Sequence, residues 1–187
     1  AAELLKPPAT ATSEAIPPIQ ELAKLRGNAE AGQQIFSTSG TCSKCHKVRG
    51  EGKEIGPDLS EIGSKLARED MFLSILNPSA AVSHNYETYT LLTADGQVLT
   101  GLLMNQNDQS LTIRNAEGID TTVERADVDE LKKQSVSLMP ADLQKALSLQ
   151  NLIDVVEYMA SLRHIENAEP SGQTAGNTTE KQAAPVI

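Results

Sequence analysis

Residues 42–46 of the chain read Cys-Ser-Lys-Cys-His and contain both of its cysteines. Two residues separate the cysteines, so both sulfurs can reach one edge of a flat macrocycle while the adjacent histidine turns beneath it. This is the attachment pattern of a c-type haem, in which the sulfurs form thioethers and the histidine binds iron. We therefore predict one covalent haem c, anchored by Cys42 and Cys45 and ligated by His46.

Three other uses of a cysteine pair fit the sequence less well. A zinc site needs about four Cys, His or carboxylate ligands, and only His84 and His164 remain as further histidines. A thioredoxin-like redox pair accompanies a βαβ pattern, which we do not find. A disulfide across two intervening residues would be strained and would contribute little to folding. Haem attachment is favoured over all three.

The remaining sequence suits one domain with extensions. Residues 1–27 contain two Pro-Pro pairs among Ala and Thr, which is the composition of an arm or linker. Residues 165–187 are rich in small and polar side chains and predict a disordered tail. Between them, apolar residues recur at helical spacing in three segments, residues 29–37, 69–76 and 149–162. Asn28 and Ser148 are the expected N-caps of the first and last of these helices.

Between the second and third predicted helices, the residue pattern changes from that of helices to that of β-strands. Four segments are rich in β-forming side chains, namely residues 86–93, 98–104, 111–113 and 121–123. Asp95-Gly96 is a strong hairpin turn between the first two. The sequence thus predicts an antiparallel β insert at about 85–131, within a domain that spans residues 28–164.

A haem iron bound by one histidine has an open sixth position. Of the four methionines, two lie on apolar faces of predicted helices and one lies in the β insert. Met139 instead lies in the loop Ser-Leu-Met-Pro, where Pro140 stiffens the backbone. A thioether ligand favours reduced iron. We predict Met139 as the sixth ligand, with His84 or an open, water-bound position as the alternatives.

Together these segments resemble the class I cytochrome c family. The matching residues are Gly32 and Phe36 in the first helix, the motif at 42–46, Gly56-Pro57 and Leu59 after it, Met139-Pro140, and Tyr158 in the last helix. The resemblance assigns Pro57 and Leu59 to the haem site. It implies that the carbonyl of Pro57 accepts a hydrogen bond from His46. It also implies that the first and last helices cross where Gly32 faces Tyr158.

The β insert distinguishes the chain from small class I cytochromes. With dispersed matches such as Asn77-Pro78-Ser79, it resembles the Pirellula/Verrucomicrobium-type haem-binding domain, which is often attached to β-propeller, sugar-dehydrogenase-like proteins. The implied fold is mainly α, a class I cytochrome c helical core with a small antiparallel β insert, and α+β overall. The implied function is single-electron transfer by a carrier that is not an enzyme. The alternatives are a haem enzyme or gas-sensing module with an open distal site, and an excised electron-transfer module of a larger dehydrogenase.

Charge and hydropathy limit the partners. The formal net charge of −9 argues against nucleic acid, and the absence of a run of 18 apolar residues argues against a membrane span. Haem thioethers are normally assembled outside the cytoplasm, so we expect a periplasmic or exported protein. Because its first residues lack the pattern of a signal peptide, we expect that peptide to have been removed or the chain to come from a larger protein.

The partner is expected to be a redox protein, and a fused or associated dehydrogenase is one candidate. Basic residues gather in or after the motif and before the methionine loop, at Lys44, Lys47, Arg49, Lys53, Lys132 and Lys133. On an acidic body these side chains would form a basic rim that attracts an acidic partner.

Overall fold

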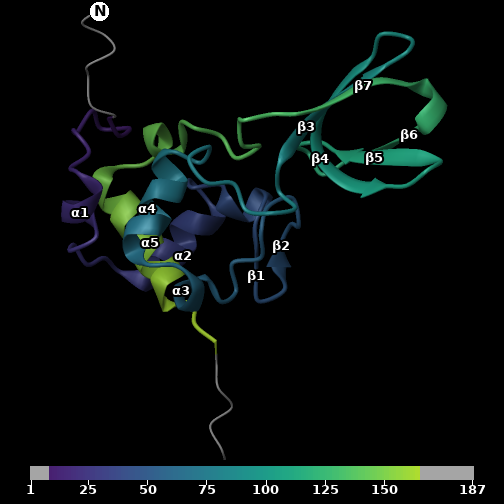
Figure 1. Cartoon of the computed structure of the whole chain (residues 1–187). Coiled ribbons are helices and arrows are strands. Elements are labelled where there is room, and N and C mark those ends of the chain that lie inside the picture. Colours follow the sequence, from purple (N-terminus) through teal and green to yellow (C-terminus); the bar gives the residue numbers. More distant parts are fainter. Residues whose placement is uncertain (1–8, 165–187) are drawn as a thin grey trace, which may run out of the picture.

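The structure is a computed structural model that describes residues 9–164, so the tail expected at 165–187 lies outside the described residues. A helical body carries a β-sheet that projects from one side (Figure 1). The body contains α1 (Ile19–Leu22), α2 (Ala29–Ser37), α3 (Ile62–Lys65), α4 (Arg68–Leu76) and α5 (Leu149–Ser161), with 3-10 turns η2 (Cys42–Lys44) and η4 (Leu143–Ala146). A short hairpin of β1 (Lys47–Val48) and β2 (Glu51–Gly52) follows η2.

The three predicted helices are confirmed as α2, α4 and α5, and their local signals work as expected. The side chain of Asn28 accepts a hydrogen bond from the backbone N–H of Ala31 at the start of α2. Ser148 does the same for the N–H of Asn151 at the start of α5. Each cap satisfies one of the backbone donors that a helix start leaves unpaired.

Helices α2 and α5 cross in close contact, as the resemblance implied. A Cβ atom on Gly32 would lie 2.0 Å from the carbonyl oxygen of Asp154 and 2.9 Å from Cβ of Tyr158. One turn further along α2, the Phe36 ring meets Tyr158 edge-on, with ring centroids 5.6 Å apart. Glycine therefore allows the two backbones to approach, and the aromatic pair fills the space beside the crossing.

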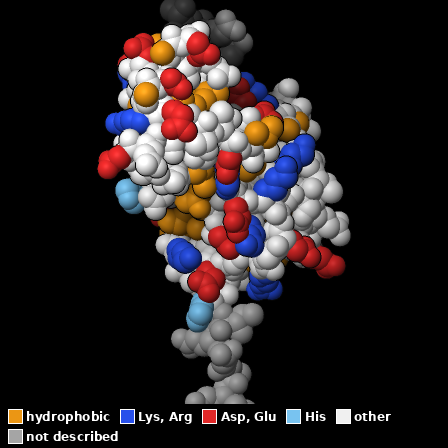
Figure 2. Space-filling view, turned by 90° about the vertical axis from the view of Figure 1, so that its right-hand side faces the viewer, with side chains coloured by type: hydrophobic (Ala, Val, Ile, Leu, Met, Phe, Trp, Pro, Cys, Tyr) orange, Lys and Arg blue, Asp and Glu red, His pale blue; other side chains and the backbone are white. Residues whose placement is uncertain are grey.

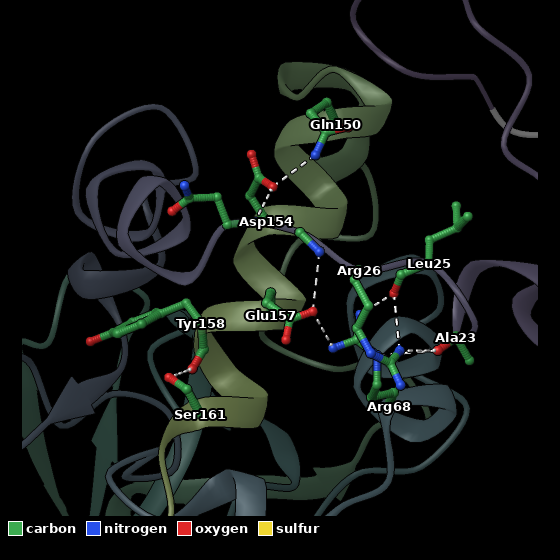
Figure 3. Close-up of polar contacts among 11 residues, drawn as sticks. Ala23, Leu25, Arg26, Arg68, Gln150, Asp154, Glu157, Tyr158 and Ser161 are labelled. Atoms are coloured by element: carbon green, nitrogen blue, oxygen red, sulfur yellow. Dashed lines mark hydrogen bonds and ion pairs between the residues drawn. The ribbon is translucent and has the colours of Figure 1, made fainter.

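A buried carboxylate fastens this crossing. Asp154 is 6% exposed, and its Oδ1 accepts hydrogen bonds of 2.8 Å from the backbone N–H of Asn28 and from Nε2 of Gln150. Figure 3 shows the bond between Gln150 and Asp154 along α5. Because both donors saturate one oxygen, the carboxylate is accommodated inside the helical body.

The described part of the segment expected to be an arm packs onto the body. Ile16 and Leu22 are buried in the main core, together with residues of α4 and α5. Arg68 ties the end of this segment down, since it donates to the carbonyl oxygens of Ala23 and Leu25 at 3.2 and 2.7 Å. It also pairs with Glu157 of α5 at 2.9 Å (Figure 3). Residues 9–26 therefore belong to the folded body.

The insert is a five-stranded antiparallel sheet, one strand more than expected. Its strands are β3 (Thr88–Thr93), β4 (Val98–Gln106), β5 (Ser110–Arg114), β6 (Asp120–Glu124) and β7 (Val128–Lys133), in the order β6-β5-β4-β3-β7. Leu91, Leu111 and Ile113 form its small buried core. Strand β7 extends the insert beyond residue 131, to Lys133.

The missed strand has a physical explanation. In β7 the less exposed apolar residues are Val128 and Leu131, three positions apart, instead of the two-residue spacing of a regular strand. A register shift between Leu92 and Thr93 of β3 accommodates this spacing. The expectation of an α+β fold agrees with this structure, whereas that of a mainly α chain is corrected: the described residues form a mixed fold of helices and a substantial sheet. No described helix is long and apolar enough to cross a membrane.

Candidate haem-binding site

The cysteine–histidine motif forms one compact turn after α2. The backbone N–H groups of Cys45 and His46 both donate to the carbonyl oxygen of Cys42, at 3.1 and 2.8 Å. Cys42 packs against the small cluster of Phe36, Val48 and Leu162. Both cysteines are free thiols. The turn therefore presents two available sulfurs and an imidazole within five residues.

Burial keeps these cysteines protonated. It raises the pKa of the Cys42 thiol to about 11 and also raises the pKa of Cys45. The positive charges of Lys53 and Lys44 partly oppose the rise in the pKa of Cys45. Both groups are thiols at neutral pH, and a thiol is the form that adds across a vinyl group to give a thioether.

The imidazole of His46 is oriented by the loop that follows. Its Nδ1 lies 2.8 Å from the carbonyl oxygen of Pro57. Because a carbonyl only accepts, Nδ1 carries the proton and Nε2 keeps a free lone pair. Burial lowers the pKa of His46, although the Pro57 carbonyl partly opposes the shift. The ring is neutral at pH 7, in the tautomer that can bind iron through Nε2.

Gly56 and Leu59 fit this arrangement closely. A Cβ atom on Gly56 would lie 2.6 Å from Cε1 of the His46 ring, so only glycine leaves room for the imidazole. The backbone N–H of Gly56 donates to the carbonyl oxygen of Cys45 at 2.7 Å. Leu59 donates to Lys47 through its backbone N–H at 2.8 Å and packs against two core clusters. The loop is thus folded back onto the motif.

Met139 lies in an ordered loop against the helical core. It is partly buried and packs against the cluster formed by α4 and α5. Its backbone N–H donates to Oγ of Ser137 at 3.1 Å, and the N–H of Ser137 donates to Oγ of Ser79 at 3.0 Å. The methionine loop is therefore tied to the residues that follow α4. The alternative ligand His84 has a side chain that is 88% exposed and lies 3.5 Å from Glu87.

The donors suit a haem better than a simple metal ion. Within residues 9–164, no three His, Cys, Asp or Glu side chains cluster as a metal site would require. Two free thiols and a neutral imidazole of the correct tautomer are instead the groups that a covalent haem uses. The residues present fit haem c.

The comparison with protein families agrees with this chemistry. Residues 29–100 match the family model described as cytochrome c. The match covers less than half of the chain and supports a haem-binding, electron-transfer role for these residues. The match begins at the first residue of α2 and ends within β4, so Met139 lies beyond it. A search of curated proteins gives no match, and the narrower Pirellula/Verrucomicrobium type stays a prediction.

Sequence reasoning missed two groups that contact this site. Ser79 supports the methionine loop, and Arg114 of the insert reaches the loop after the motif. Ser79 is marked in the sequence only by the Asn77-Pro78-Ser79 match and Arg114 is not marked at all, because each acts on a segment far away in the sequence.

Proposed function

We propose that the chain is a monohaem c-type cytochrome that transfers single electrons, with His46 and Met139 as the two axial ligands. The observation that supports it most strongly is the 2.8 Å contact between Nδ1 of His46 and the carbonyl oxygen of Pro57. A haem c bound at this motif would supply an iron that accepts and releases one electron. Cytochrome c domains are usually extracytoplasmic, which supports an exported location.

The surrounding residues have distinct roles in this proposal. Cys42 and Cys45 anchor the macrocycle by its edge. The carbonyl of Pro57 accepts a hydrogen bond from Nδ1 of His46, which makes Nε2 a stronger electron-pair donor to iron and favours oxidised iron. The thioether of Met139 favours reduced iron. With protein ligands in both axial positions, substrates and gases have no ready access, so the protein acts as a carrier.

A redox titration followed by visible spectroscopy tests the proposal. We expect one reversible one-electron transition, the charge-transfer band of methionine-ligated ferric haem at the red end of the spectrum, and slow carbon monoxide binding to the reduced protein. Mass spectrometry should find one haem per chain. Rapid carbon monoxide binding by a protein without the charge-transfer band would instead favour a haem enzyme or gas sensor.

Two of the six basic residues expected to form a rim are engaged in ion pairs. Lys47 forms an ion pair with Glu54, and Lys133 pairs with Glu87 at 3.1 Å. Acidic and basic side chains are interspersed on the face shown in Figure 2. Lys53 is exposed and forms no ion pair within the described residues. We propose that Lys44 and Lys53, which both act on Cys45, are the basic residues that attract an acidic redox partner to the haem edge.

Charge reversal at Lys53, which lies outside the attachment motif, tests this surface. We expect Lys53→Glu to slow oxidation of the reduced protein by the ferricyanide anion about fivefold at low ionic strength, because local attraction becomes repulsion. The difference should shrink at high salt, where the charges are screened. Stopped-flow absorbance measures both rates.

The matched control is Lys24→Glu, which changes net charge equally. Lys24 lies two residues after α1 and pairs with Glu21 at 2.7 Å. Helix α1 lies on the opposite side of the body from β1 and β2 (Figure 1). Equal slowing by both variants would show that only net charge matters and would contradict a local docking surface.

A further inference from the structure

The β insert reaches back to the loop that follows the haem motif. Arg114, the last residue of β5, donates from Nε and Nη2 to both carboxylate oxygens of Asp120, at 2.6 and 2.8 Å. Its remaining nitrogen, Nη1, donates to the carbonyl oxygen of Glu54 at 3.1 Å. Since Asp120 fixes the plane of the guanidinium, the third bond has a defined direction. One side chain thus joins β5, β6 and the haem loop.

A second contact lies at the turn between β5 and β6. Gly118 has a φ of +84°, and a Cβ atom on it would lie 3.2 Å from Cδ1 of Ile55. Ile55 is only 5% exposed. The turn therefore covers Ile55, next to the residue that Arg114 holds. The insert therefore contacts two neighbouring residues, Glu54 through a hydrogen bond and Ile55 through packing.

These two residues lead directly into the groups that orient the histidine. The N–H groups of Ile55 and Gly56 both donate to the carbonyl oxygen of Cys45, at 3.0 and 2.7 Å. Two residues beyond Ile55, the carbonyl of Pro57 contacts His46. The loop 54–57 thus lies between the insert on its outer side and the histidine on its inner side. Movement of its outer end would be transmitted along at most three residues to the Pro57 carbonyl.

We propose that Arg114 is a positioning residue, through which the β insert clamps the loop 54–57 and fixes the hydrogen bond between Pro57 and His46. This inference rests on the proposed function in that His46 is taken as the iron ligand. Without the clamp, the Pro57 carbonyl draws less on the Nδ1 proton and the ring becomes a weaker donor. Oxidised iron is then less stabilised, and the reduction potential rises.

The variant Arg114→Lys tests the clamp in the haem-loaded protein. Lysine keeps the positive charge but has no fork that can hold Asp120 and reach Glu54 together. We expect a higher reduction potential than in the wild type. We also expect hydrogen exchange at the amides of Ile55 and Gly56 to become about fivefold to tenfold faster, as for the loss of one hydrogen bond.

Arg125→Lys is the matched control, because Arg125 lies in the same insert, is exposed and makes no side-chain hydrogen bond within the described residues. It should change neither measurement. In Arg114→Ala the direction of the change in reduction potential is a further test. Loss of a positive charge alone would lower the potential, whereas loss of the clamp raises it. Asp120→Asn keeps Arg114 but weakens the paired hydrogen bonds that orient it. This variant should also show faster hydrogen exchange at Ile55 and Gly56, and it replaces the alanine variant if that variant does not fold.

An unchanged potential and unchanged exchange in Arg114→Lys would overturn the clamp, and so would equal changes in Arg125→Lys. The proposed function fails separately. If the wild-type spectrum shows that His46 does not bind iron, the exchange rates at Ile55 and Gly56 still report whether Arg114 holds the loop.

Discussion

Replacing Met139 by alanine is expected to abolish the methionine charge-transfer band and to lower the reduction potential on the order of tenths of a volt. The thioether is a soft ligand that stabilises reduced iron, and alanine offers no donor in its place. The backbone N–H groups of Met139 and Ser137 donate to the hydroxyls of Ser137 and Ser79, so the substitution should remove the ligand without unfolding its support. Visible spectroscopy and a redox titration measure both effects.

Met104→Ala is the matched control, since Met104 lies in β4 and is 43% exposed. It should leave the band and the potential unchanged. A Met139→Ala protein with the wild-type spectrum would contradict the assignment. If His84→Ala then changed the spectrum, His84 would be identified as the sixth ligand. Carbon monoxide should bind the reduced Met139→Ala protein rapidly, because its sixth position is no longer closed by the chain.

Replacing Gly32 by alanine is expected to destabilise the protein by about 3 kcal/mol or more. The added Cβ would lie 2.0 Å from the carbonyl oxygen of Asp154, and backbone atoms cannot move aside as a flexible side chain would. Helices α2 and α5 must separate, which weakens the hydrogen bond from Asn28 to Asp154 and the packing of Phe36 on Tyr158. Urea denaturation of the haem-loaded protein measures the loss.

The neighbouring Gln33→Ala provides the comparison. Gln33 is exposed in the same helix, where alanine is favourable and surface changes usually stay within about 0.5 kcal/mol. A Gly32→Ala protein that unfolds at the same urea concentration as Gln33→Ala would show that the helices do not need this close approach.

The predicted features that agree with the structure depend on neighbouring residues. Asn28 and Ser148 cap their helices because each hydroxyl or amide oxygen needs only a backbone donor three residues away. The hairpin around Asp95-Gly96 forms between β3 and β4 for the same local reason. The contact between Pro57 and His46 came from resemblance to a family pattern, and its 2.8 Å distance agrees with that expectation.

The features that were missed depend on distant partners. Strand β7 has four exposed positions, and it is a strand because β3 offers an edge with which it can pair. Residues 9–26 have the composition of a linker, yet Ile16 and Leu22 enter the main core because α4 and α5 leave an apolar surface for them. Composition describes each segment alone and carries no information about the surface it meets.

By itself, the sequence was enough to predict the cofactor class and its anchors, because Cys42, Cys45 and His46 lie within five consecutive residues. Only the tertiary structure shows that Arg114 contacts the loop next to His46. Arg114 and Glu54 lie 60 residues apart, and no periodicity or spacing links them. Their contact exists because the end of β5 and the turn before β6 lie against the loop 54–57, and that placement results from the packing of the whole chain.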